Sequence, residues 1–358
     1  MDRPTITRIR FQNFRVLRDA ELVLHPLTLI VGANGSGKST AIDALARVAQ
    51  PENILWEDVV HASARTASDA EVSIEVHWGG LSEEWISVGS WVPTGPPLAF
   101  TVPSSAVAQS SVRKLTAKVR AGARLDLPGR ATTAKDLARR LASTVPFRLS
   151  PEALRRPSGV AQNARLGGDG AGLPAVVDRL REDDPERFGA LNAELARILP
   201  EFDQVVTQTT VSGQKLVGLR TREGKHKILA EHLSDGVLLL LALLTVAHDT
   251  HQGALVCLEE PDRGLHPRVL RELRDALVRL AFPDGTAVHR APTQVLVTTH
   301  NPYLLDLFRD HPEQVVLANR RGLDATFEAL ADRKDLGDIL GNSQLSEVWF
   351  SGVLGGVP

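Results

Sequence analysis

The 358-residue sequence has a single cysteine, 4% aromatic residues and no long apolar run. One cysteine excludes a disulfide framework and a cysteine-based zinc site, which is typical of proteins in a reducing compartment. Residues 1–14 contain no apolar segment of signal-peptide length, and the longest apolar run, residues 236–248, is too short to span a bilayer. We therefore expect a cytoplasmic protein without membrane contact.

The chain also lacks an overall excess of charge, because its formal net charge is −2. Its basic residues are nevertheless concentrated: thirteen basic and three acidic side chains give residues 111–165 a net charge of +10, so the rest carries −12. Such a surface suits a nucleic-acid backbone, because each neutralised phosphate releases counterions. Phe147 is the only aromatic residue in this stretch, which does not favour base stacking.

Two interpretations of the basic stretch stay open. One is contact with DNA or RNA, and the other is a solvated insertion whose arginines pair with acidic residues of this chain or of a second subunit. The side chains predicted to contact DNA under the first interpretation are Arg113, Lys114, Lys118, Arg120, Arg139, Arg140, Arg155 and Arg156.

A complete phosphate-binding loop, GANGSGKST, stands between an apolar β-branched run at residues 27–31 and a helical period that resumes at residue 41. Its glycines allow backbone angles barred to other residues, so that consecutive N–H groups can face the β- and γ-phosphates. A chance glycine-rich turn is the alternative. The residues predicted to bind nucleotide here are Gly32, Ala33, Asn34, Gly35, Ser36, Gly37, Lys38, Ser39 and Thr40.

The last residues of this loop have distinct expected roles. Lys38 is expected to reach the phosphate oxygens and assist catalysis, and the Ser39 hydroxyl is expected to bind Mg²⁺. ATP and Mg²⁺ are therefore the expected cofactors.

The opening segment, ITRIRFQNFRVLRDAELVLHPLTLIVGANGSGKSTAIDAL, resembles the start of RecF/SMC-like ATPase heads, the ABC-type branch of P-loop proteins. The NFR step and the GxNGxGKS form carry this resemblance. It implies an α/β P-loop NTPase of ABC-ATPase head type, with a mixed central sheet, an antiparallel β subdomain and, here, a helical lid insertion. Such heads usually carry a glutamine that senses Mg²⁺. Gln50 is the only glutamine between the loop and residue 100, and its place before Pro51 is typical of a surface residue.

An LSDG sequence opens a strongly apolar helix at residue 233 and matches the start of the ABC signature motif. Taken alone the match is weak, because Ser-Asp is simply a good helix N-cap. Its order after the phosphate-binding loop strengthens it. The resemblance implies that Ser234 and the N–H of Gly236 bind the γ-phosphate held by another subunit's loop. Two ATP molecules would then lie between the heads of a homodimer.

The run GALVCLEEPD, residues 253–262, is an apolar strand that ends in two carboxylates, the Walker B arrangement. One carboxylate at such a strand end can face Mg²⁺ while the other faces the attacking water as general base. By position Glu259 is the metal-side residue, where relatives commonly have aspartate, and Glu260 is the base. The alternative is an acidic loop after a buried strand. Cys257 is expected to pack in the core.

The sequence EEPxxGLHP that follows is particular to RecF-like and OLD-like ATPases. His266 within it is either a dimer-interface residue or a cap before Pro267. His300, in TTHNPYLLD after a further apolar strand, matches the switch histidine, which in the family hydrogen-bonds the γ-phosphate and orients the attacking water. OLD-family proteins continue into a Toprim nuclease. Fewer than sixty residues follow His300 here, so we expect no built-in nuclease.

With 43% hydrophobic residues, the chain can form one large domain or two unequal ones. The predicted division is an ATPase head, residues 1–90 and 205–358, and a basic, partly helical lid, residues 91–204. Strands are expected in 5–31, 69–78, 205–211, 215–222 and 294–298, and an edge strand at 315–317. The pattern is weak in 79–110, where we expect loops with short strands. Helices are expected at 134–143, 173–199 (broken near Pro185) and 268–280.

The predicted function is Mg²⁺-dependent ATP hydrolysis by heads that dimerise around ATP, coupled to DNA in repair or in defence against mobile elements. The alternative is an ATP-gated scaffold or sensor that controls a separately encoded effector protein without touching nucleic acid. An ABC transporter motor is disfavoured by GLHP and by the compact insertion.

Overall fold

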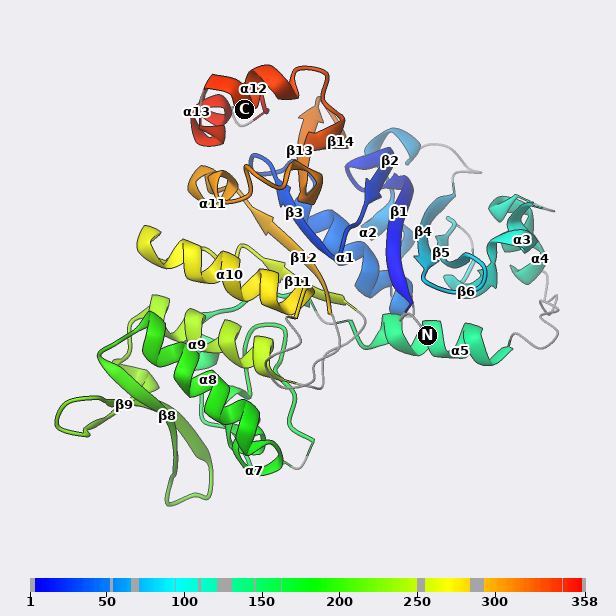
Figure 1. Ribbon diagram of the computed structural model, residues 1–358. Helices are drawn as coiled ribbons and strands as arrows, with labels where there is room; N and C mark the ends of the chain where they lie inside the picture. Colours follow the sequence, from blue (N-terminus) through cyan, green and yellow to red (C-terminus); the bar gives the residue numbers. More distant parts are fainter. Residues whose placement is uncertain are drawn as a thin grey trace.

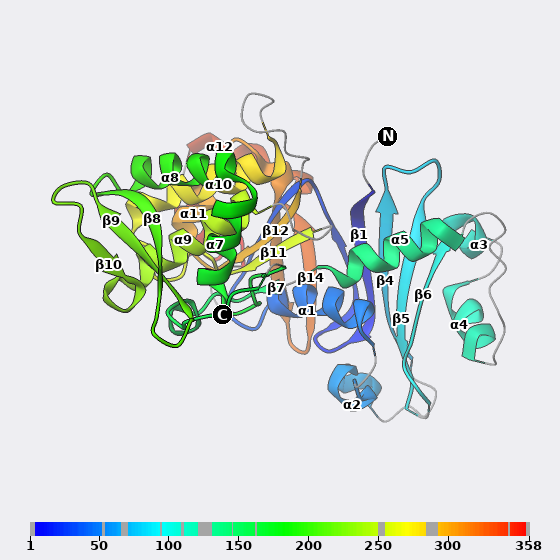
Figure 2. The same ribbon diagram turned by 90° about the horizontal axis from the view of Figure 1, so that it is seen from below.

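The structure is a computed structural model (Figure 1). It describes residues 4–51, 54–65, 71–93, 95–108, 111–120, 131–144, 146–161, 163–249, 255–283, 293–342 and 344–355. Figure 2 shows three regions side by side: helices with a small sheet, a central sheet, and an antiparallel sheet with its own helices.

The central sheet has six strands in the order β14-β13-β3-β12-β11-β7. All of its neighbouring pairs are parallel except β13 and β14. The strands are β3 (Leu27–Val31), β7 (Pro146–Phe147), β11 (Leu255–Glu259), β12 (Gln294–Thr299), β13 (Val315–Arg321) and β14 (Asp324–Ala329). Helices and the second sheet cover both faces of β3 and β12, so these strands are continuously apolar rather than alternating.

Two hydrophobic cores lie on opposite faces of the central sheet. Leu29 and Val31 of β3 pack into one core with α9 (Asp235–His248) and α10 (Leu270–Ala281). Ile30 packs into the other core with α1 (Lys38–Ala49) and the antiparallel sheet. Cys257 belongs to this second core and is fully buried, as expected, and its burial raises the pKa of its thiol. The alternation of side chains along β3 thus joins the two halves of the molecule.

The antiparallel sheet has the strand order β2-β1-β4-β5-β6. Its strands are β1 (Thr5–Phe14), β2 (Leu17–Val23), β4 (Val72–Gly79), β5 (Trp85–Trp91) and β6 (Leu98–Pro103). The strands expected in residues 5–31 and 69–78 are present. The short strands expected among loops in residues 79–110 are β5 and β6. Their pattern is weak in sequence because β5 is buried on both faces and therefore shows no alternation.

The stretch 91–204 is distributed over the molecule. The short helices α3 (Ser104–Ala108) and α4 (Val112–Arg120) lie near β6, and α5 (Ala131–Ala142) packs on α1 (Figure 2). Strand β7 joins the central sheet, and α6 (Pro151–Leu154) packs against α9. The division of the chain into head and lid stays a prediction.

Two helices and a small three-stranded sheet complete the side of the molecule that carries α9. Helices α7 (Leu173–Asp183) and α8 (Pro185–Ile198) meet at Asp184, whose side chain accepts a hydrogen bond from the Arg187 N–H, as the break near Pro185 predicted. The hairpin expected near Gly213 is formed by β8 (Phe202–Thr209) and β9 (Lys215–Thr221), and β10 (Lys227–Leu229) adds a third strand. Short helices occur at α2 (Trp56–Val59), α11 (Pro302–Asp306), α12 (Leu336–Asn342) and α13 (Leu345–Phe350).

The expectation of an edge strand at residues 315–317 is wrong. Strand β13 lies inside the sheet, between β3 and β14, because the chain turns at Gly322 (φ 63°) and pairs back as β14. Glycine tolerates this left-handed conformation without the steric cost that other residues incur.

Across the described ranges, the structure contains no helix with the length and hydrophobicity needed to cross a membrane.

The buried face of α9 yields a stability prediction. Leu241 is fully buried, so Leu241→Ala should lower the free energy of unfolding by about 2–5 kcal/mol through lost burial and a residual cavity. Leu55→Ala deletes the same atoms at a side chain that is 65% exposed, and should change the free energy of unfolding by less than about 0.5 kcal/mol. Urea denaturation measures both, and equal shifts in midpoint would contradict the assigned core.

Candidate active site

The phosphate-binding sequence forms the turn between β3 and α1. Gly35 and Gly37 have φ values of 78° and 93°, which are unfavourable for residues with a Cβ. A Cβ at Gly32 would lie 2.5 Å from the carbonyl oxygen of Ala318 in β13, so this position also requires glycine. The loop therefore has the backbone course expected of a phosphate-binding turn.

Lys38 is buried inside this loop. Its Nζ donates hydrogen bonds to the carbonyl oxygens of Gly32 (2.7 Å) and Ala33 (2.9 Å). Burial lowers the pKa of Lys38, and the nearby carboxylates of Glu260 and Glu259 partly oppose this effect. The ammonium group thus lies at the loop, within the field of both acidic side chains.

Ser39 and Glu259 meet across 220 residues of sequence. The Ser39 hydroxyl, at the start of α1, donates to Oε1 of Glu259, at the end of β11. Both are hard oxygen donors of the kind that Mg²⁺ prefers. The described residues contain no cluster of three or more His, Cys, Asp or Glu side chains able to hold a metal by themselves. A hydroxyl and one carboxylate fit Mg²⁺, which is usually bound by one or two protein oxygens together with water and phosphate.

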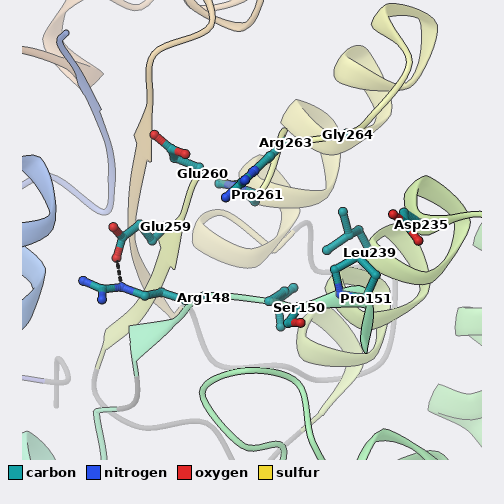
Figure 3. A pocket seen from close by; sticks show the side chains of 11 residues that line it. Arg148, Ser150, Pro151, Asp235, Leu239, Glu259, Glu260, Pro261, Arg263 and Gly264 are labelled. Carbon is teal, nitrogen blue, oxygen red and sulfur yellow. Dashed lines mark hydrogen bonds and ion pairs between the residues drawn. The ribbon is translucent and has the colours of Figure 1, made fainter. Parts of the chain in front are cut away.

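Arg148, which follows β7, donates from Nε to the other oxygen of Glu259, Oε2 (Figure 3). No sequence pattern assigns an individual role to Arg148, because it is one of thirteen basic residues in its stretch. Gln50, the glutamine nearest the loop, caps the end of α1 and is exposed, as expected of a surface residue.

Glu260 and His300 are directly hydrogen-bonded, with 2.7 Å between Oε1 of the carboxylate and Nδ1 of the imidazole. The Glu260 backbone has φ 47°, a left-handed conformation that is rare for a residue with a long side chain. Its N–H donates to the carbonyl oxygen of Thr298 at 2.9 Å, which holds this conformation against the end of β12.

Asp262 and Thr299 form a further contact that the sequence did not indicate. The Thr299 hydroxyl donates to Oδ2 of Asp262 at 2.9 Å, and the Asp262 side chain is buried. Burial raises the pKa of Asp262, while the Thr299 hydrogen bond acts in the opposite direction. This contact fixes the loop after β11 to the end of β12.

The signature sequence lies at the start of α9. Ser234 is the N-cap, and its Oγ accepts a hydrogen bond from the Val237 N–H at 3.4 Å. A Cβ at Gly236 would lie 3.1 Å from the carbonyl oxygen of Gly264, so the helix start packs closely on the loop that follows Glu260. A cavity of about 480 Å³ separates this helix start from the ends of β7 and β11, with Asp235 on one side and Glu259 on the other (Figure 3).

The basic side chains predicted to contact DNA divide into two sets. Four of them lie within salt-bridge distance of carboxylates: Arg113 with Glu71, Arg139 with Asp136, Arg155 with Asp235, and Arg156 with Glu152. Lys114 and Lys118 are exposed on α4, and Arg140 is half-buried on α5. The side chain of Arg120 lies outside the described residues.

Two more side chains near the site can be placed. The imidazole of His266 accepts a hydrogen bond from the Arg268 N–H at 3.2 Å, which is the capping arrangement that the sequence left open. Arg320, at the end of β13, donates to the carbonyl oxygen of Gly35 at 3.3 Å. No sequence pattern pointed to Arg320, because β13 comes next to the loop only in the folded sheet.

A phosphate-binding loop after β3 of a mixed sheet, together with carboxylates at the end of the parallel strand β11 and with β12 between the two strands, defines a P-loop ATPase of ABC head type. Residues 104–306, more than half of the chain, match the family described as "AAA domain, putative AbiEii toxin, Type IV TA system", and the chain belongs to this family. Residues 5–119 match the family described as "AAA ATPase domain".

Solved structures of SMC heads share the fold. An SMC head bound to the C-terminal winged-helix domain of ScpA aligns with a TM-score of 0.62 and 13% identity, covering 90% of this chain and 97% of that one. A second SMC head, with an extended coiled coil and bound to the C-terminal domain of ScpA derived from Pyrococcus furiosus, gives 0.52 and 13%, covering 91% and 96%.

One curated relative matches in sequence. An OLD nuclease of Thermus scotoductus (strain ATCC 700910 / SA-01) is 50% identical over 40 residues, which is 11% of this chain and 8% of that protein. The aligned stretch is thus a small part of the relative. The chain is therefore an ATPase of the AAA family with the fold of SMC heads, and a short stretch of its sequence is similar to an OLD nuclease.

The raised pKa of Asp262 yields a prediction about pH. Between the unfolded and the folded pKa, the folded protein keeps a proton that the unfolded chain has released, so this group makes stability fall as pH rises. Asp262→Asn removes the charge and keeps an acceptor for Thr299. The melting temperature of the variant minus that of the wild type should therefore increase from about pH 4 to about pH 8.

The matched control is Asp310→Asn, which removes an exposed carboxylate. A difference between Asp262→Asn and wild type that stays constant with pH would contradict the burial argument.

Proposed function

We propose that the chain hydrolyses ATP with Mg²⁺ at composite sites between two copies of the head. The observation that carries this proposal is the meeting of Ser39, Glu259 and the Glu260–His300 pair at the carboxyl ends of β3, β11 and β12. In α/β sheets, ligands bind at this edge.

Each group has a proposed role in phosphoryl transfer. Lys38 and the N–H groups of the loop stabilise charge on the transferring phosphoryl group, and the loop residues Gly32 to Thr40 bind the nucleotide. Ser39 and Glu259 hold Mg²⁺, which when bound neutralises charge on the phosphate oxygens. The burial of Lys38 supports its role, because a charge acts more strongly where water is excluded.

Glu260 is proposed as the general base that activates the attacking water. Two observations support this assignment: its backbone is held in a left-handed conformation, and its carboxylate is fixed by His300. A strained residue costs of the order of 1–3 kcal/mol and persists only where its surroundings enforce it, which is frequent at active sites. His300 orients the carboxylate and completes the water site.

Ser234 and the Gly236 N–H are proposed to bind the γ-phosphate held by the second copy. Both are at the N-terminus of the 14-residue helix α9, where unpaired N–H groups and the helix dipole favour an anion. The γ-phosphate would then hold two heads together, and its hydrolysis would release them, together with any surface bound only by the closed pair.

Two couplings of this cycle are proposed. The first is to DNA, through exposed residues of α4 such as Lys114 and Lys118, and it is supported by the charge of the stretch and by similarity to a protein named as a nuclease. The second is to a separately encoded effector protein. Two observations support this second coupling. Four of the basic side chains already pair with carboxylates of this chain instead of being free for DNA, and the family description names a toxin–antitoxin system.

Removal of the proposed base tests the composite site. Glu260→Gln keeps the shape of the side chain but cannot accept the proton of water, so kcat should fall by about 10²–10⁴-fold. The variant should still bind ATP and form a dimer, measured by light scattering after gel filtration with ATP and Mg²⁺. Lys38→Ala, which should lose ATP binding, is the matched control. A Glu260→Gln protein that is monomeric with ATP bound would rule out the composite site.

The two couplings are separated by the ATPase rate with double-stranded DNA at low and moderate salt. If the cycle is coupled to DNA, double-stranded DNA should raise the ATPase rate. This stimulation should fade as the salt concentration rises, because each phosphate contact releases counterions. The double variant Lys114→Glu/Lys118→Glu should need at least about tenfold more DNA to reach the same stimulation of the ATPase rate. Lys334→Glu, an exposed change outside the basic stretch, should not. A rate indifferent to DNA would favour the effector.

A further inference from the structure

The two-residue strand β7 places Arg148 beside Glu259. In the parallel pairing of β7 with β11, Pro146 aligns with Cys257 and Phe147 with Leu258. The next residues along these strands are Arg148 and Glu259, and they lie side by side (Figure 3). Since β7 is an edge strand of the central sheet, this contact joins the basic stretch directly to the Walker B carboxylate.

The backbone around Arg148 is fixed on several sides. The Arg148 N–H donates to the carbonyl oxygen of Gly168 at 2.7 Å, and the Ser150 N–H donates to that of Asp169 at 2.8 Å. Phe147 and Leu154, on either side, are buried in the core that contains α9. Farther along, the Arg155 guanidinium donates to the carbonyl oxygen of Leu233 at 2.9 Å. The guanidinium of Arg148 therefore extends from a rigid support.

The Glu259 carboxylate divides its two oxygens between two donors. Oε1 accepts from the Ser39 hydroxyl and Oε2 accepts from Nε of Arg148. Because the donors use different oxygens, a cation held by Ser39 and Oε1 does not have to displace the guanidinium. Contact through Nε keeps the carboxylate in one orientation, in the way that outer hydrogen bonds commonly fix the ligands of a metal.

The length of glutamate explains why such a support is needed. Glutamate has one more rotatable bond than aspartate, and ordering its side chain costs more conformational entropy. The carboxylate of Glu259 also lines the same cavity as that of Glu260, and like charges repel each other. An adjacent guanidinium offsets this repulsion and restricts the extra rotation.

We propose that Arg148 is a positioning residue for the divalent cation: it holds Oε2 of Glu259 so that Oε1 stays directed at the Ser39 hydroxyl. This inference rests on the proposed Mg²⁺-dependent ATPase. It assigns Arg148 no contact with the nucleotide and no part in proton transfer.

The test is Mn²⁺ binding to the full chain in the presence of a non-hydrolysable ATP analogue, adenylyl imidodiphosphate, followed by electron paramagnetic resonance of free Mn²⁺. Arg148→Gln should raise the apparent Kd for Mn²⁺ by about tenfold, the lower end of the usual effect of losing a metal-supporting hydrogen bond. Arg148→Lys, which keeps the charge but loses the planar fork, should fall between wild type and Arg148→Gln. The affinity for the analogue in EDTA should be unchanged in both variants.

The matched control is Arg10→Gln, on β1. It removes a guanidinium that pairs with Glu21, and the Arg10 side chain is 56% exposed against 59% for Arg148. Mn²⁺ affinity should be unaffected there, and circular dichroism should show native folding of every variant.

Three results would overturn the proposal. Unchanged Mn²⁺ affinity in Arg148→Gln would leave the contact without a role in metal binding, and tighter binding would make Arg148 a competitor of the cation. An equal loss of analogue affinity in EDTA would place Arg148 on the phosphates. If the wild-type protein itself bound neither analogue nor Mn²⁺, the proposed function would fail first, which distinguishes the two failures.

Discussion

The whole candidate site depends on one geometric constraint, which is that the carboxyl ends of parallel strands meet at one edge of a sheet. Strands β3, β12 and β11 are neighbours, and each is followed or ended by a group of the site: the phosphate-binding loop, His300 and Glu259. The contact between Ser39 and Glu259 joins residues far apart in sequence. A small change in strand pairing would separate them.

The two cores hold this edge in place. Successive residues of β3 pack into different cores, so a displacement of this strand would disturb the packing on both faces of the central sheet. Polar contacts then determine the finer geometry. Thr298 and Thr299, at the end of β12, hold the Glu260 backbone and the Asp262 side chain respectively. These bonds are buried or half-buried, where an unmade hydrogen bond costs about 1–3 kcal/mol, so they favour a single arrangement of the loop.

The basic stretch contributes to the site as well as to the surface. Arg148 contacts the Walker B carboxylate, and Arg155 contacts Asp235 and the carbonyl oxygen of Leu233 before α9. Residues 146–155 therefore contact both the Walker B carboxylate and the signature sequence. In the proposed mechanism, the first serves the ATP site of its own head and the second serves the ATP site of the partner head. A movement of this segment would shift the side chains at both motifs. This is a physical route by which DNA or an effector could influence the proposed ATPase cycle.

The sequence by itself determined the type of fold and the motifs. The glycine loop, the paired carboxylates and TTHNP are local patterns, as are the apolar strands before them, and local patterns can be read without long-range contacts. Only the tertiary structure decided what lies beside them. Arg148 and Arg320 reach the site through strand pairing, β13 is interior because β14 covers it, and β5 shows no alternation because both its faces are buried. Such relations depend on register and layer packing, which no single segment of the sequence encodes.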